Sequence, residues 1–348
     1  MILDVRKDEQ KMNSYLEVRS CGRRIPLVDY LKGFSIFTIA LMHLMSLMPS
    51  IPSPIITLSA IGGTGVHVFF LCSGIGLYTS YLHHQTGYGE FLKKRFLKIY
   101  VPYILVVILS FFLPWMYEGD AKGTALLSHI FLFKMFVPQF EESFGVQFWF
   151  VSTILQLYLL FIPMCRIKNK LGNNKLFASL FLGLSVLWWI FCYCADVGHI
   201  RIWGSFCLQY IWEFALGFVL AEALYKGGSY RIKNVYLLVL AVAGIGLQAG
   251  LAMFSDVLKV FNDIPGLVGY ASLALWLSHI PFVKKLCGKL SAFSYEYFLV
   301  HMLLFMTSFY LVNPQGLLME CLLGGISMIA ALALAWGYHV VLKKIRFA

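Results

Sequence analysis

The stretch from Leu27 to Met48 reads LVDYLKGFSIFTIALMHLMSLM. A helix needs roughly 20 mostly apolar residues to cross the hydrocarbon core of a bilayer, and this stretch has that length. Its ionisable residues are Asp29, Lys32 and His43. A charge inside a bilayer costs about 3 kcal/mol or more, so such groups mark candidate functional sites. The stretch therefore predicts a membrane-spanning helix that carries part of a site.

The spacing of these residues predicts how they lie on the helix. Asp29 and Lys32 are one turn apart and can pair. Lys32 and His43 are eleven residues apart, so they share one face and are separated by about 16 Å along the axis. With the N-terminus in the cytoplasm, Lys32 lies near the inner end and His43 in the outer half. The structural alternatives are a snorkelling lysine and a histidine that bonds a neighbouring helix.

The composition of the whole chain indicates a membrane protein. Of the 348 residues, 59% are hydrophobic and 13% are charged, whereas soluble domains are about 45–50% apolar and about 25% charged. This excludes a soluble enzyme, a nucleic-acid-binding domain, a disordered protein and a secreted disulfide scaffold. The apolar runs are continuous rather than alternating, which favours an all-α polytopic bundle over a β-barrel.

Ten membrane-spanning helices are expected. Their predicted ranges are 27–48, 56–82, 99–117, 146–165, 176–195, 205–225, 235–254, 262–281, 290–312 and 317–341. With the N-terminus inside, 23 of the 28 Lys and Arg residues fall in cytoplasmic segments, as the positive-inside rule requires. The net charge of +11 is thus explained by cytoplasmic loops. We expect a cytoplasmic N-terminal segment at 1–26, a transmembrane domain at 27–342 and a cytoplasmic C-terminal tail at 343–348.

One long connection, 118–145, contains the apolar segment 128–137, which is too short to span and is expected to be re-entrant or interfacial.

The eight cysteines are scattered without metal-type spacing, and no metal site is expected. Buried packing is the default for them; the alternative is an outer-face disulfide between Cys192 or Cys194 and Cys207.

Further candidate residues lie beyond the first span. Arg95 and Lys98, one turn apart, are suited to bind phosphates, although positive-inside bias also explains them. The polar and aromatic candidates in later spans are His67, Ser73, Trp149, Ser152, Tyr158, Glu213, Glu296 and His301. Structural explanations compete with a functional role for two of them: close helix packing for Ser73 and an interfacial aromatic belt for Trp149. His67 is a candidate neighbour of His43. His279 and His339 are expected at the membrane interface.

In this order, the segments resemble the acyltransferase 3 family of integral-membrane transacylases. The motifs that carry the resemblance are Val28–Gly33 followed by His43; Gly65–Gly74; Arg95, Lys98, Ile99 and Pro102; Trp149, Ser152, Gln156 and Tyr158; Glu213–Gly217; and Tyr295–His301. The likeness covers most of residues 25–340. The chain has Lys32 where the family has Arg. It also has His67 at a family aspartate and Ile154-Leu155 at an acidic pair, and these two departures indicate a divergent subfamily.

The resemblance implies a multi-pass O-acyltransferase of the inner (plasma) membrane. Such an enzyme moves an acyl group, usually acetyl, from cytoplasmic acyl-CoA to a hydroxyl of a cell-envelope or exopolysaccharide glycan or its lipid-linked precursor. Acetyl-CoA is then a donor substrate rather than a bound cofactor, and the partners are the glycan acceptor and the bilayer, without nucleic acid. The oligomeric state is left open, a homodimer included.

The resemblance also suggests roles for the candidate residues. His43 is the expected general base, Asp29 orients the motif, and a transient acyl-His43 is an alternative. The CoA phosphates are expected on Lys32, Arg95 and Lys98. The remaining candidates would form the substrate pocket: His67, Ser73, Trp149, Ser152, Tyr158, Glu213 and His301. The rival functions are a transporter or flippase for a lipid-linked glycan, which more often shows paired half-repeats, and a membrane scaffold, which does not explain why Lys32 and His43 share a face.

Overall fold

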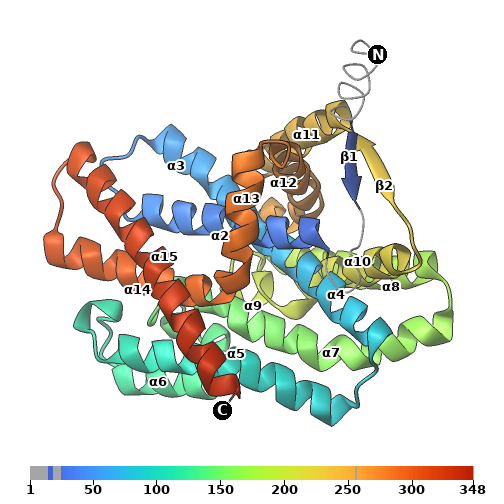
Figure 1. Cartoon of the computed structure of the whole chain (residues 1–348). Coiled ribbons are helices and arrows are strands. Elements are labelled where there is room, and N and C mark those ends of the chain that lie inside the picture. The colour runs from blue at the N-terminus through green and yellow to red at the C-terminus, as the bar shows by residue number, and fades with distance from the viewer. Residues whose placement is uncertain (1–14, 19–24, 255–256, 348) are drawn as a thin grey trace.

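Helices make up nearly all of the structure, a computed structural model that describes residues 15–18, 25–254 and 257–347 (Figure 1). The α-helices are α2 (Pro26–Ser46), α3 (Ser53–Ser59), α4 (Gly65–His83), α5 (Tyr88–Phe111), α6 (Lys122–Ile130), α7 (Trp149–Leu171), α8 (Asn174–Cys194), α9 (Arg201–Gly204), α10 (Cys207–Tyr225), α11 (Asn234–Phe254), α12 (Asp263–Leu277), α13 (Pro281–Leu290), α14 (Ser294–Val312) and α15 (Leu317–Phe347). Strands β1 (Tyr15–Val18) and β2 (Tyr230–Lys233) pair antiparallel. The expected all-α class is confirmed.

The length and composition of the helices are those of a membrane bundle. Among the described residues, eight helical segments are long and apolar enough to cross a membrane. They are Pro26–Ser46, Ser53–His83, Val146–Leu171, Asn174–Cys194, Arg201–Tyr225, Asn234–Phe254, Pro281–Val312 and Leu317–Ile345. The apolar helix α12 is shorter, at 15 residues, and α5 begins with a charged segment. The chain is thus a multi-pass membrane protein, and a count of ten spans stays a prediction.

Three predicted boundaries differ from the observed ones. The expected second span divides into α3, a 3-10 turn at Ala60–Thr64 and α4. The bounds expected for the third span, 99–117, are wrong, because α5 begins at Tyr88 and ends at Phe111. The Glu, Leu, Lys and Arg residues before position 99 are strong helix formers, so the basic motif is helical and Pro102 lies inside the helix. The single segment expected at 128–137 is replaced by α6 and short turns.

Helix α2 lies at the centre of the bundle, with α4, α13 and α14 packed around it. The close approach depends on glycine. A methyl group at Gly33 would lie 1.8 Å from the carbonyl oxygen of Cys287, and one at Gly74 would lie 2.2 Å from that of Phe214. Small residues let membrane helices approach until their backbones touch. Gly74 therefore serves the close contact between α4 and α10.

The described cysteines are free thiols. Cys192 and Cys207 are buried and Cys194 is exposed. The disulfide considered for the outer face is absent between these three residues, and the default of buried packing describes Cys192 and Cys207.

Candidate functional site

A cavity of about 450 Å³ lies among α2, α4, α5, α7, α14 and α15. Its polar lining residues include Asp29, Lys32, Ser73, Arg95, Lys98, Tyr158, Ser291, Ser294, Tyr295, Glu296 and His339. Its apolar lining residues include Ile39, Val66, Phe69, Leu77, Ile99, Phe150, Ile154 and Phe298. Charged groups thus share one space with an apolar wall.

Three basic side chains meet at this cavity. Lys32 comes from α2, whereas Arg95 and Lys98 come from α5. The two helices are far apart in the sequence, so the fold brings together the cations expected to bind phosphates. Gly76 of α4 leaves room beside the ammonium, since a methyl group there would lie 4.0 Å from Lys32 Nζ.

The cavity follows one face of α2. Ile39, which lines it, is two turns beyond Lys32, and His43 is one further turn along the same helix. His43 itself is not among the lining residues. The cations and His43 therefore lie toward opposite ends of a path along α2, and the apolar part of the cavity lies between them.

His43 pairs with a second imidazole from α14. Its Nδ1 lies 2.9 Å from Nε2 of His301, and the rings stack with centroids 5.1 Å apart. His301 is completely buried, and its Nδ1 lies 3.1 Å from the carbonyl oxygen of Tyr297. His301 was expected in the substrate pocket. It is not among the residues that line the cavity, and it contacts His43 from α14.

The hydrogen bonds determine the tautomers if both imidazoles are neutral. A carbonyl oxygen only accepts, so His301 Nδ1 must donate to Tyr297. His301 Nε2 is then an acceptor, and His43 Nδ1 donates to it. Consequently His43 Nε2 carries no proton and has a free lone pair. This assignment follows from the network, and it leaves His43 with the atom that a general base needs.

The remaining pocket candidates divide into two groups. Ser73 and Tyr158 line the cavity. Ser152 is buried in α7 and is not among the lining residues. Trp149 faces Arg201, whose guanidinium lies 5.4 Å from the indole ring centroid. Arg201 also pairs with Glu141 at 2.8 Å.

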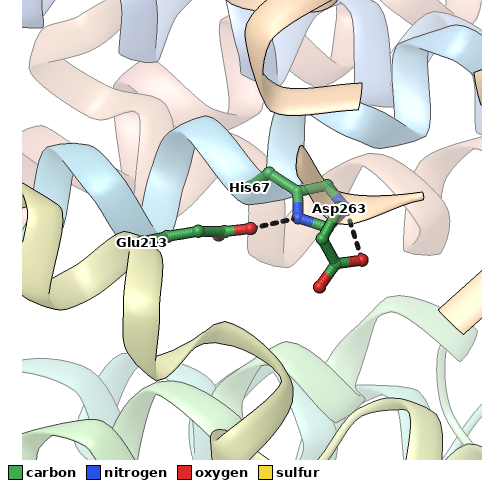
Figure 2. Close-up of side chains that lie close together, drawn as sticks. All are labelled: His67, Glu213 and Asp263. Carbon is green, nitrogen blue, oxygen red and sulfur yellow. Dashed lines mark hydrogen bonds and ion pairs between the residues drawn. The ribbon is translucent and has the colours of Figure 1, made fainter. Parts of the chain in front are cut away.

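His67 and Glu213 lie apart from the cavity and bind each other. The distance from His67 Nδ1 to Glu213 Oε1 is 2.6 Å, and Asp263 lies on the other side of the imidazole (Figure 2). His67 thus has carboxylate neighbours rather than the candidate neighbour His43.

The cavity contains a pair for which the sequence predicts no role. His339 Nδ1 lies 3.2 Å from Glu296 Oε1, and both residues line the cavity. His339 was expected only at the interface. The two residues are on different helices, α14 and α15, and no spacing along the chain relates them. The only feature of the sequence that could have marked these two residues as functional candidates is their position within otherwise apolar helices.

Comparison with known proteins gives one positive finding. A family model described as an acyltransferase domain, that of acyltransferase 3, matches residues 25–340. No curated protein and no solved structure matches the chain. The matched region begins just before α2 and ends within α15, so it includes the cavity, the imidazole pair and the His67 cluster.

Proposed function

Because the chain belongs to the acyltransferase 3 family, we propose that it transfers an acyl group, most simply acetyl, from cytoplasmic acyl-CoA to a hydroxyl group. The acceptor in this proposal is a glycan of the cell envelope or its lipid-linked precursor, and the membrane is the plasma membrane. The observation that carries the proposal is the path along α2, with three cations at one end and an imidazole pair beyond the other.

The donor matches the two ends of this path. The phosphates of CoA are polyanionic, and charge-assisted contacts from Arg and Lys bind phosphate oxygens strongly. In the proposal, Lys32, Arg95 and Lys98 bind them. Lys32 and His43 are separated by about 16 Å along the helix, a gap that suits the long, flexible pantetheine arm. The thioester then lies beside the apolar wall near Ile39.

The free lone pair on His43 supports a role as the base. In the proposed step, His43 Nε2 takes the proton of the acceptor hydroxyl while the oxygen attacks the thioester carbonyl. The tetrahedral intermediate collapses, the carbon–sulfur bond breaks, and the leaving thiolate of CoA takes the proton from His43. His301 Nε2 holds the Nδ1–H of His43 throughout, so it stabilises the imidazolium form and positions the ring. The alternative is attack by His43 Nε2 itself, which forms a transient acyl-histidine.

A thermal-shift experiment tests donor binding directly. Purified protein in detergent is heated with and without acetyl-CoA. A ligand that binds only the folded state at a hundredfold excess over Kd stabilises it by about 2.7 kcal/mol, so the melting temperature should rise. The shift should disappear in Lys32→Ala and Arg95→Ala. The shift should persist in Lys94→Ala. Lys94 is an exposed lysine of α5, the helix of Arg95, but it pairs with Glu90 and does not line the cavity.

The result that contradicts the proposal is the absence of a shift with acetyl-CoA, succinyl-CoA and longer acyl-CoAs alike. A shift that survives equally in Lys32→Ala and Arg95→Ala would remove the proposed phosphate contacts. Stabilisation by a glycan lipid alone would favour the transporter.

A further inference from the structure

Three helices bring metal-ligating side chains together outside the cavity. His67 lies in the first turn of α4, Glu213 in the second turn of α10, and Asp263 at the first position of α12. Each offers one donor atom, and the three atoms lie within 4.8 Å of one another. Glu213 is 0% exposed and Asp263 is 5% exposed. Figure 2 shows the imidazole between the two carboxylates.

The cluster needs a counterion when both carboxylates are ionised. Two ionised carboxylates beside a neutral imidazole carry two negative charges in a buried place, where an uncompensated charge is very costly. His67 Nδ1 is 2.6 Å from Glu213 Oε1, and His67 Nε2 is 3.9 Å from Asp263 Oδ1. Among the described residues, no Lys or Arg forms an ion pair with either carboxylate.

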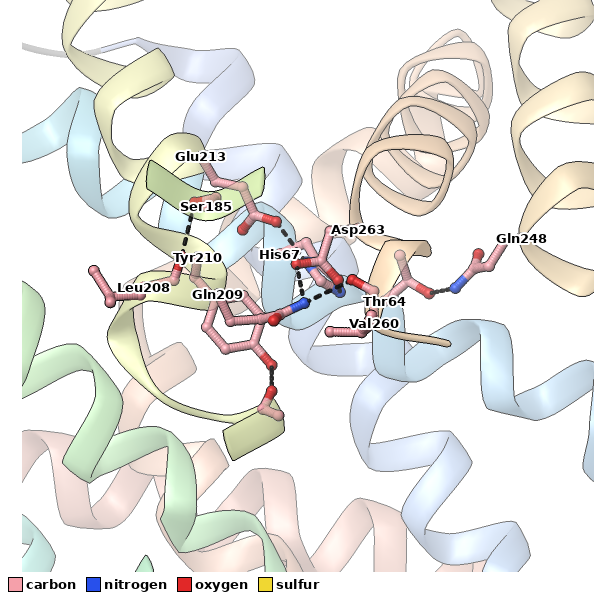
Figure 3. Close-up of polar contacts among 11 residues, drawn as sticks. Thr64, His67, Ser185, Leu208, Gln209, Tyr210, Glu213, Gln248, Val260 and Asp263 are labelled. Atoms are coloured by element: carbon pink, nitrogen blue, oxygen red, sulfur yellow. Dashed lines mark hydrogen bonds and ion pairs between the residues drawn. The ribbon is translucent and has the colours of Figure 1, made fainter. Parts of the chain in front are cut away.

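The hydrogen bonds around the cluster leave acceptors unused. Gln209, one turn before Glu213, donates from Nε2 to Asp263 Oδ2 at 2.8 Å and to the carbonyl of Val260 at 3.0 Å (Figure 3). Gln209 Oε1 and Glu213 Oε2 are buried without a partner. A buried polar atom normally has a partner. With Glu213 ionised, both unpaired atoms are acceptors, which a cation or a hydrogen-bond donor would satisfy.

We propose that His67, Glu213 and Asp263 bind one divalent first-row transition-metal ion, of the zinc or manganese class. Imidazole nitrogen and carboxylate oxygen are ligands that such ions accept together. The ion replaces the hydrogen between His67 and Glu213 and neutralises the two carboxylates. Gln209 then positions Asp263 from outside the coordination sphere, a role that metal sites commonly give to hydrogen-bonded neighbours.

The ion would connect α4, α10 and α12. Helix α4 contributes Val66, one residue before His67, and Phe69, two residues after it, to the wall of the cavity. The metal cluster itself does not line the cavity, so this inference stands independently of the proposed acyl transfer. Its effect would be to stabilise the cavity wall rather than to contact the substrate.

Metal content is the decisive measurement. Tag-free protein in detergent is stripped with a chelator, reloaded with Zn²⁺ or Mn²⁺, desalted and measured by elemental mass spectrometry. We expect about one ion per chain in the wild type and a loss of about tenfold or more in Glu213→Gln and Asp263→Asn. The matched control is Glu320→Gln, because Glu320 is also a buried carboxylate but accepts from Ser50 instead. It should retain the ion.

Two results would overturn the proposal. One is a wild type that holds less than about a tenth of an ion per chain after reloading, which would leave protons rather than a metal ion to neutralise the cluster. The other is equal metal content in the wild type and in both variants.

A measurement on the wild type alone covers the case in which the variants fail to fold. Zn²⁺ should raise its melting temperature, and X-ray absorption should show only nitrogen and oxygen ligands. Sulfur ligands, or no thermal shift, would contradict this site.

Discussion

His43 can act as a base only if its Nε2 is unprotonated, and that state depends on a residue 258 positions away in the sequence. The Tyr297 carbonyl requires a proton on His301 Nδ1, which leaves His301 Nε2 to accept from His43. Without that acceptor the imidazole of His43 is free to rotate and to change tautomer. His301 is therefore a positioning residue in the proposed reaction.

Substitutions at these two residues should have different effects. General base catalysis contributes typically about 100- to 10,000-fold, so His43→Ala should lower kcat for acetyl transfer by that factor. His301→Ala should lower kcat less, leave the KM for acetyl-CoA nearly unchanged and alter the pH profile of kcat. His301→Gln should recover part of the loss, because its amide oxygen can still accept from His43 Nδ1–H. Membrane-embedded enzyme with radiolabelled acetyl-CoA provides the measurement.

Specific results with these variants would contradict the roles proposed for His43 and His301. The thermal shift with acetyl-CoA serves as the control for folding and donor binding, and it should be present in all three. A His43→Ala protein that transfers acetyl groups at the wild-type rate would exclude His43 from the chemistry. If His301→Ala and His301→Gln lose activity equally with an unchanged pH profile, His301 has only a packing role.

The sequence predicted relations within one helix far better than those between helices. Lys32 and His43 could be placed on one face of α2 because the helical repeat relates them directly. The contacts His43–His301 and Glu296–His339 were not predicted, because they depend on how α14 and α15 are rotated against their neighbours. Likewise, His67 was identified as an unusual residue, but its carboxylate partners on α10 and α12 were not.

At the scale of the helices, α4 and α5 shape the part of the cavity that holds the basic residues. Helix α5 begins at Tyr88, earlier than expected, so Arg95 and Lys98 lie in its second and third turns rather than at its start. Across the cavity, α4 presents Gly76 beside Lys32. The absence of a side chain at this position is therefore part of the space proposed for the CoA phosphates.

Filling that space gives a test of the proposed donor site. Gly76→Leu places a branched side chain near Lys32 Nζ. The apparent Kd for acetyl-CoA should therefore rise at least tenfold, which corresponds to about 1.4 kcal/mol of binding free energy. The melting temperature without ligand should not fall, because Gly76 is exposed and Leu is about 0.5–1 kcal/mol better than Gly within a helix. Thermal shifts over a range of acetyl-CoA concentrations measure both effects.

The control for Gly76→Leu is the same change at Gly183 of α8, where a methyl group meets nothing within 4 Å. Gly183→Leu should leave the apparent Kd for acetyl-CoA unchanged. Equal affinity in Gly76→Leu and the wild type would show that the phosphates do not enter between α4 and α2.

At the scale of the whole molecule, the order of helices and charges constrains which side each loop faces. Eight helical segments of the described chain are long and apolar enough to cross. Helices α5 and α12 complete the predicted ten. Helix α12 has 15 residues, short of the roughly 20 that a perpendicular crossing needs, but its neighbours cover it: Gly244 of α11 lies directly against its Gly269.

The prediction at this scale is that the segment after α4 and the segment after α12 both lie in the cytoplasm. Ten spans with the N-terminus inside give this result, and it agrees with the positive charge that follows both helices, at Lys93–Arg95 in α5 and at Lys284 and Lys285 in α13. If α12 did not cross, the sidedness of the segment between α12 and α14 would be reversed. Fusions truncated after residue 95 and after residue 285 should therefore fluoresce as green fluorescent protein reporters and be inactive as alkaline phosphatase reporters.

The matched comparison is a fusion in the loop between α8 and α10, after residue 198, which the same topology places outside and which should give active phosphatase and no fluorescence. An active phosphatase after residue 285 would contradict the crossing of α12. It would also place α14, and with it His301, in the opposite orientation to α2. Because His301 contacts His43 across these two helices, that result would contradict the imidazole pair as well. The sidedness of one loop thus tests both the topology and the geometry on which the proposed base depends.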